Sequence, residues 1–204
     1  MARIGGRTDG AAVPTVACPS LSATVDLGTL LATLWFFLPA YVGNMAPVLI
    51  GGHLSVLAVP IDGGRSWRGA RLFGDHKTWR GIVAGVVAGA GVGLVQQVLL
   101  AAGLHPGPVL PAALPSLTAG TVLGLGAGVG DAVKSFFKRR AGISPGGTWI
   151  PFDQLDFMAG AWLLVLPLAT PPAPATLLTL PIVFAGTVAV TTVGHRLGLK
   201  EAWI

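Results

Sequence analysis

The sequence predicts an all-α polytopic membrane protein with five transmembrane helices. The chain of 204 residues is 52% hydrophobic and only 10% charged, with 13 basic and 8 acidic residues, and its mean hydropathy is +0.74. A soluble domain carries about 25% charged residues. Uncharged intervals of 35, 50 and 39 residues separate Asp26 from Asp62, Arg80 from Asp131, and Asp156 from Arg196. Each interval can supply one or two spanning helices of about 20 apolar residues.

The five spans follow from these intervals in order. The first interval predicts one span at about residues 27–48. The second is divided by the turn signal His105-Pro106-Gly107-Pro108, which predicts spans at about 81–102 and 111–130. The third is divided by a proline-rich turn at 171–174, which predicts a short span at about 155–171 and another at 177–193. We expect residues 1–204 to form a single membrane-embedded domain.

The basic residues predict the orientation in the cell membrane. Eleven of them lie in the segments after spans one and three and in the C-terminal tail, against Arg3 and Arg7 on the other side. Basic residues favour the cytoplasmic side, so we expect an external N-terminus and two cytoplasmic loops, 50–80 and 131–156. Because the basic residues are confined to short loops between apolar spans, a nucleic-acid partner is also disfavoured. The single Cys18 excludes an intramolecular disulfide.

Glycine recurs at every fourth position within the second and third spans. Gly81, Gly85, Gly89 and Gly93 form one set, and Gly120, Gly124 and Gly128 form another. Residues four apart share a helix face, and small residues there let two membrane helices approach closely. The third span also superficially resembles a dinucleotide-binding fingerprint, but no strand precedes it, so helix packing is the favoured interpretation.

The second loop combines carboxylates, ammonium groups and a hydroxyl. Asp131, Lys134, Ser135 and Lys138 would form one polar stripe if the third helix continues past the membrane. A carboxylate suits Mg²⁺, and ammonium groups suit phosphate oxygens. Lys138 and the two arginines after it could instead anchor anionic lipid headgroups. That alternative would not explain Asp131.

Two further acids stand at the start of the fourth span. Asp153 and Asp156 are three residues apart, so on a helix they project to one side. They could share or flank a magnesium ion, or one of them could simply cap the helix. Because capping needs a single carboxylate, we favour the functional interpretation.

The two loops together resemble a known enzyme superfamily. Gly130-Asp131, Ser135, Lys138-Arg139, Gly146-Gly147, Asp153 and Asp156 are similar to the signature of the CTP-dependent phosphatidate cytidylyltransferases. The block Gly74–Gly81 is similar to that superfamily's Lys-Thr-Trp-Glu-Gly segment. The short chain, Arg80 after the tryptophan and Asp62-Gly63-Gly64 resemble the archaeal branch, the CDP-archaeol synthases. The chain departs from the bacterial pattern in a shorter connection before Asp153 and in Gln154, where bacterial members have arginine.

The resemblance implies a nucleotidyl transfer with Mg²⁺ as cofactor. CTP and 2,3-di-O-geranylgeranylglyceryl phosphate, an isoprenoid ether-lipid phosphate, would give CDP-archaeol and pyrophosphate in archaeal phospholipid biosynthesis. The implied catalytic residues are Asp131, Lys138, Asp153 and Asp156, and the three aspartates are the expected metal ligands. The expected substrate-binding residues are Asn44, Asp62, Gly63, Gly64, Asp75, Lys77, Thr78, Arg80, Lys134, Ser135 and Arg139. For Asn44, a hydrogen bond between helices is an equally good interpretation.

Three alternatives accompany this prediction. A phosphatidate cytidylyltransferase would use a fatty-acyl ester lipid instead of an ether lipid. A CDP-alcohol phosphotransferase is disfavoured because six residues separate Asp62-Gly63 from Ala70-Arg71 where its signature needs two. A small transporter would place polar groups near the bilayer midplane, where Gln96 and Gln97 are the main candidates. The sequence leaves the oligomeric state open.

Overall fold

The computed structural model describes residues 25–50, 55–110 and 113–196. Five α-helices build it: α1 (Leu27–Ile50), α2 (Trp79–Ala101), α3 (Leu117–Arg140), α4 (Phe152–Val165) and α5 (Ala173–Arg196). The segment between α1 and α2 adds a 3₁₀ turn, η1 (Ser55–Leu57), and a small antiparallel hairpin of β1 (Ser66–Trp67) and β2 (Ala70–Arg71). The predicted helical fold is confirmed, and the hairpin is an addition to it. Arg3, Arg7 and Cys18 lie outside the described residues.

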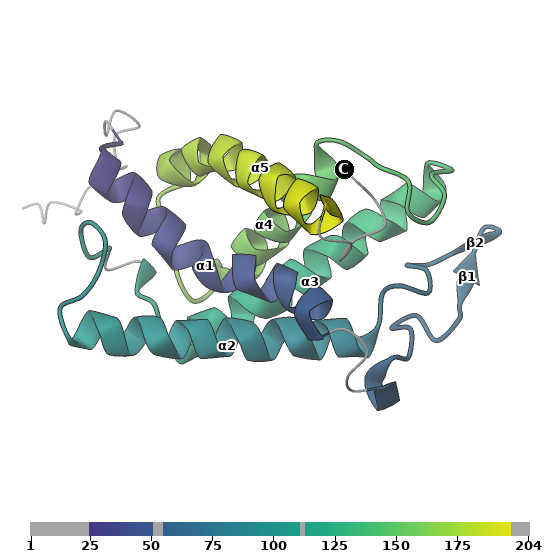
Figure 1. Cartoon of the computed structure of the whole chain (residues 1–204), viewed down its shortest axis with the longest axis horizontal. Helices are drawn as coiled ribbons and strands as arrows, with labels where there is room; N and C mark the ends of the chain where they lie inside the picture. Colours follow the sequence, from purple (N-terminus) through teal and green to yellow (C-terminus); the bar gives the residue numbers. More distant parts are fainter. Residues whose placement is uncertain (1–24, 51–54, 111–112, 197–204) are drawn as a thin grey trace, which may run out of the picture.

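The helices enclose one apolar core. Helix α3 packs against both α2 and α4, and α1 lies across α2 and α3 (Figure 1). The core is filled by Phe36 and Phe37 of α1, Leu123 of α3, and Phe157 and Met158 of α4, all at most 1% exposed. Helix α4 packs mainly against α3 and also contacts α1 and α5, and α5 covers one side of the cluster (Figure 1).

The glycine faces bring α2 and α3 into backbone contact, as predicted. A Cβ on Gly89 would lie 2.8 Å from the Cα of Gly124, and a Cβ on Gly93 would lie 2.8 Å from the Cα of Gly120. A third crossing was not predicted: a Cβ on Gly160 of α4 would lie 2.6 Å from the Cα of Gly130. These crossings fix α3 between its two neighbours because no side chain fits in either interface.

The predicted ends of three helices, α3, α4 and α5, need correction. Helix α3 begins at Leu117, because Ser116 caps it by accepting a hydrogen bond from the Ala119 N–H at 3.0 Å. It continues to Arg140 instead of ending at 130. Residues 131–140, predicted as part of a loop, are therefore helical.

Helices α4 and α5 are also shifted from the predicted spans. Helix α4 runs over Phe152–Val165 and not 155–171, and it stops just before Leu166-Pro167, because Pro167 has no backbone N–H with which to continue the helical hydrogen bonds. Helix α5 begins four residues before the predicted 177, since proline is tolerated in a first turn. By length and composition, α1, α2 and α5 could cross a membrane; among the described helices, α3 and α4 do not meet that criterion.

Candidate active site

A polar cavity of about 330 Å³ lies where the cytoplasmic-loop segments predicted from the sequence meet the helix ends. It brings together residues from α1, from the segment before α2, and from α3 and α4. Seven of the predicted site residues line it: Asn44, Lys77, Thr78, Asp131, Lys134, Asp153 and Asp156. Residues of both charged segments thus line one cavity.

Lys77 reaches this cavity because the first loop is closed at its base. The Ile61 N–H donates to the carbonyl of Lys77 at 2.8 Å, and the Trp79 N–H donates to the carbonyl of Val59 at 3.0 Å. Thr78 then caps α2 by accepting from the Gly81 N–H at 3.3 Å. The ammonium group of Lys77 consequently forms an ion pair with Asp131, 54 residues away in the chain.

Asp62 holds the rest of this loop together and does not line the cavity. Its side chain is fully buried and accepts hydrogen bonds from Arg71 at 2.7 Å and from the backbone N–H groups of Gly64, Phe73 and Gly74. Burial alone would raise the pKa of the Asp62 carboxyl, but these donors outweigh burial and lower it. Gly74 adopts φ +94°, a conformation that suits glycine.

Helix α3 presents its charges on one face, as the spacing predicts. The Nζ atom of Lys134 lies 2.9 Å from Asp131, 3.1 Å from Asp153 and 2.7 Å from Asp156. Burial would raise the pKa of Asp131, but the nearby charges of Lys77 and Lys134 lower it. Burial would lower the pKa of Lys134, and the charges of Asp131 and Asp156 raise it. The ammonium group of Lys134 therefore lies among three carboxyl groups.

Asp153 joins α4 to the next turn of α3. Lys138 is buried and donates to both carboxylate oxygens of Asp153, at 2.9 and 3.0 Å. Burial would raise the pKa of Asp153, and these hydrogen bonds lower it. The N-cap of α4 is Pro151 and makes no side-chain capping bond. Capping therefore does not account for either Asp153 or Asp156.

The remaining predicted residues do not line the cavity. Asp75 is exposed and pairs with Arg71 at 2.6 Å, and Arg139 donates to the Ser144 carbonyl. Ser135 is buried in α3. The other predicted site residues that do not line the cavity are Gly63, Gly64, Arg80 and Lys138. Their predicted contacts with substrate stay predictions.

The cavity also contains residues that the sequence analysis missed. His76 lines it beside Lys77, and Thr187 and Thr191 of α5 line it as well. The two threonines are four residues apart and share a face of the helix, and that spacing was the available signal.

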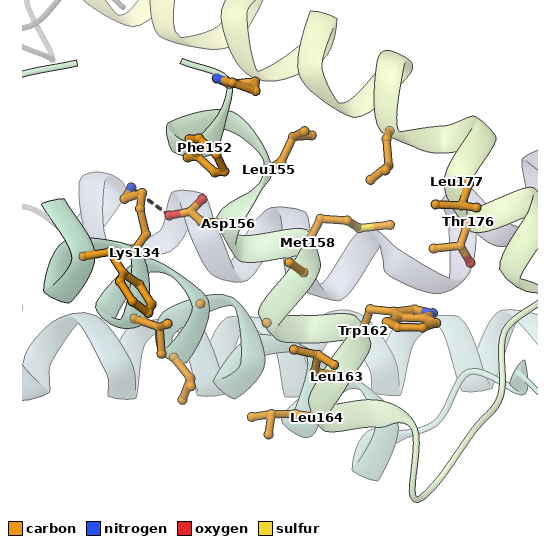
Figure 2. A pocket seen from close by; sticks show the side chains of 18 of the residues that line it. Lys134, Phe152, Leu155, Asp156, Met158, Trp162, Leu163, Leu164, Thr176 and Leu177 are labelled. Carbon is orange, nitrogen blue, oxygen red and sulfur yellow. Dashed lines mark ion pairs between the residues drawn. The ribbon is translucent and has the colours of Figure 1, made fainter. Parts of the chain in front are cut away.

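An apolar groove of about 740 Å³ adjoins the cavity between α3, α4 and α5. Figure 2 shows Lys134 and Asp156, joined as an ion pair, at one end of the groove and Trp162, Thr176 and Leu177 at the other. Within the described part of the chain, these two are the charged residues among those lining the groove, and both also line the polar cavity. The ion pair is thus a wall common to the groove and the cavity.

The carboxylates suit a hard cation such as Mg²⁺, although the described residues contain no group of three His, Cys, Asp or Glu side chains spaced to hold a metal ion. Lys134 stands between the three aspartates instead. The Oδ2 atom of Asp156 is buried and lacks a well-aligned hydrogen-bond donor among the described residues, despite its proximity to Lys134. A carboxylate oxygen in that state fits a cation ligand, and Mg²⁺ needs only one or two carboxylates besides phosphate and water.

The comparisons with known proteins agree with this geometry. A family model described as "CarS-like: CDP-archaeol synthase" matches residues 26–204. The CDP-archaeol synthase of Methanospirillum hungatei is 44% identical, over 80% of this chain and 98% of its own length. That of Halobacterium salinarum is 42% identical, over 87% and 98%.

A solved structure, described as an intramembrane enzyme for archaeal membrane lipid biosynthesis, has a TM-score of 0.65. It is 32% identical, and the match covers 79% of this chain and 93% of that one. The resemblance predicted from the sequence is confirmed, and so is the prediction of a membrane protein that makes lipids. The chain belongs to the CDP-archaeol synthase family, whose members are CTP-dependent lipid-phosphate cytidylyltransferases.

Proposed function

We propose that this protein transfers the cytidylyl group of CTP to an isoprenoid ether-lipid phosphate. An oxygen of the lipid phosphate bonds to the α-phosphorus of CTP, the bond from that phosphorus to the bridging oxygen breaks, and pyrophosphate leaves. The observation that supports this proposal best is the common wall of Lys134 and Asp156. A lipid phosphate whose chains lie in the apolar groove would place its headgroup at the edge of the polar cavity, where a nucleotide triphosphate fits.

The reaction brings two polyanions together, so charge neutralisation and in-line positioning are the main demands on the protein. Lys77 and Lys134 face the cavity from two different segments. In our proposal Lys77 binds the phosphates of the nucleotide and Lys134 binds the lipid phosphate. Lys138 keeps Asp153 in place through its two hydrogen bonds.

Mg²⁺ is the cofactor that we propose, with Asp131 and Asp156 as its protein ligands and Asp153 beside them. When bound, it would neutralise charge on the phosphates. His76 lies at the mouth of the cavity, where its ring is exposed, and could contact the terminal phosphates.

We also propose that all five helices cross the membrane, with the active site on the cytoplasmic side. Helix α3 has 24 residues, about 36 Å at 1.5 Å per residue, which exceeds the hydrocarbon thickness of about 30 Å. Helix α4 has 14 residues, about 21 Å, so the segment after it would complete the crossing. The distribution of basic residues supports this orientation.

Pyrophosphate release by purified protein in detergent tests the proposed reaction. The reaction mixture contains CTP, Mg²⁺ and either 2,3-di-O-geranylgeranylglyceryl phosphate or phosphatidate. We expect release only when CTP and the ether-lipid phosphate are both present. Preference for phosphatidate would replace the proposed acceptor with an ester lipid, and release without any lipid would contradict the transfer reaction.

A bulky residue in the groove tests where the lipid binds. Leu163 lines the groove and is 60% exposed, so Leu163→Trp should fill the groove without disturbing the core. We expect the KM for the lipid phosphate to rise several-fold while the KM for CTP stays constant. Leu94→Trp on the exposed face of α2 is the matched control. Equal effects of the two variants would contradict the proposed position of the lipid.

A further inference from the structure

The centre of the carboxylate cluster is occupied by a side chain of the protein itself. The ammonium group of Lys134 lies within 3.1 Å of an oxygen from each of the three aspartates. Asp131 has a second partner in Lys77, and Asp153 has one in Lys138. Among the described residues, Asp156 has its ion pair with Lys134 alone. A metal ion bound by Asp131 and Asp156 would therefore compete with Lys134 for the same oxygens.

The contact between Lys134 and Asp156 is close but imperfect. The two atoms are 2.7 Å apart, yet the buried Oδ2 of Asp156 lacks a donor of good hydrogen-bond geometry among the described residues. A buried carboxylate without a well-directed donor is costly, whereas a cation coordinates without needing a directed N–H bond. Lys134 thus balances the charge of the cluster but leaves the Asp156 Oδ2 atom without a well-directed hydrogen bond.

The Lys134 side chain also has space to move into when it leaves the aspartates. Its side chain lines the apolar groove as well as the polar cavity, and Figure 2 shows it at the end of the groove. Displaced from the aspartates, its ammonium group would remain at the common wall, facing the position proposed for the lipid headgroup. A cation freed there is suited to a phosphate monoester.

We propose that Lys134 is a resident counter-ion that exchanges with the metal ion, and that this exchange prepares the site for the lipid phosphate. Without metal, Lys134 neutralises the aspartates and is held away from the lipid. Arrival of the metal releases it to bind the lipid phosphate, so the metal binds before the lipid. This ordering rests on the proposed reaction, whereas the competition between lysine and metal rests only on the proposed metal ligands.

Metal affinity in the absence of both substrates tests the exchange. Mn²⁺ binding to the purified full chain is followed by electron paramagnetic resonance of the free ion. Lys134→Met removes the competing charge and keeps the length of the side chain. Because a unit charge at about 4 Å interacts strongly even at an effective dielectric near 20, we expect the variant to bind Mn²⁺ at least about tenfold more tightly than the wild type.

Arg65→Met is the control, because it removes one positive charge from an exposed side chain that does not line the cavity. We expect its Mn²⁺ affinity to equal that of the wild type. If Lys134→Met gives no gain, or if Arg65→Met gives the same gain, the exchange is wrong. Melting temperatures with and without Mn²⁺ should show a larger metal stabilisation for Lys134→Met.

A measurement on the wild type avoids any dependence on folding of the variant. Acetylation of Lys134 by acetic anhydride, quantified by mass spectrometry, reports how accessible its amine is. We expect labelling to rise several-fold when Mn²⁺ saturates the site, with Lys138 labelling unchanged. Unchanged labelling of Lys134 would overturn the exchange even if the protein turns over CTP. Increased labelling in a protein that fails to release pyrophosphate would leave the exchange standing and refute the proposed reaction instead.

Discussion

Replacing Asp131 with asparagine removes one negative charge from the meeting point of the two charged segments. In the wild type this carboxylate pairs with Lys77 and with Lys134. The amide of asparagine has nearly the same shape and can still accept a hydrogen bond, but it is a poor ligand for Mg²⁺. Asp131→Asn therefore tests the charge of the residue and not its volume.

The structure lets the effects on stability and activity be separated. Lys134 keeps Asp153 and Asp156 as partners in the variant, and the Asp131 side chain is 29% exposed. We therefore expect a loss of about 1 kcal/mol in the free energy of unfolding, near the upper end for exposed pairs. Loss of one preorganised charged group at a reacting centre costs about 10²–10³ in kcat, or about 2.7–4 kcal/mol. Activity should therefore fall far more than stability.

The assay measures initial rates of pyrophosphate release over a range of CTP and lipid-phosphate concentrations. Asp26→Asn is the control, because Asp26 caps α1 by accepting from the Thr29 N–H at 2.7 Å, and asparagine caps equally well. If the kcat/KM of Asp131→Asn lies within about threefold of the wild-type value and the melting temperature is unchanged, the role of Asp131 at the reacting centre is refuted. A comparable loss in Asp26→Asn would refute the location of the site.

Three further predictions concern the parts that position the site. Gly160→Ala should lower the unfolding free energy by about 1–3 kcal/mol in a thermal melt, because its Cβ would lie 2.6 Å from the Gly130 backbone; Gly91→Ala, which meets open space, should not. Asp62→Asn should reduce the acid sensitivity of the melting temperature, while Asp131 and Asp153, whose pKa is also lowered, retain their share of it. The pKa of Asp62 is lowered in the folded state, so its stabilisation is present above the unfolded pKa near 3.9 and is lost as pH falls further. Arg140→Met should free the β1–β2 hairpin and speed tryptic cleavage there, because the guanidinium donates to the Arg71 and Leu72 carbonyls and stacks on Phe136 at 3.6 Å.

Each of these predictions has an outcome that contradicts it. Equal melting temperatures for Gly160→Ala and Gly91→Ala would mean that α3 and α4 do not touch at this crossing. A wild-type protein whose melting temperature stays constant from about pH 5 to about pH 1, the range over which such stabilisation is lost, would contradict the role assigned to Asp62. Unchanged cleavage of Arg140→Met would mean that other contacts hold the hairpin.

Helix periodicity and charge placement predicted much of this fold because both are local properties. Spaced glycines predicted the contact of α2 with α3, and the i, i+3, i+7 spacing predicted the charged face formed by Asp131, Lys134 and Lys138. Helix ends were less predictable because they depend on single capping or proline residues. Ser116 starts α3, and Leu166-Pro167 stops α4.

Asp62 shows what a motif leaves open. An acidic residue followed by two glycines is typical of a loop that binds a ligand, yet the carboxylate faces inward to Arg71 and to backbone N–H groups up to twelve residues away. Sequence spacing cannot distinguish a carboxylate that binds a ligand from one that folds its own loop, because the partners are identified only once the loop is closed.

The sequence by itself determined the membrane character, the helical fold, the family and the residue types of the site, since these depend on composition, periodicity and motifs. Tertiary structure alone decided which of those residues meet. It placed Lys77 beside Asp131, 54 residues apart, and it put Lys134 at the centre of three aspartates and at the end of an apolar groove. The physical reason is that ion pairs and cavities depend on distances between helices, and the glycine contacts between helices set those distances.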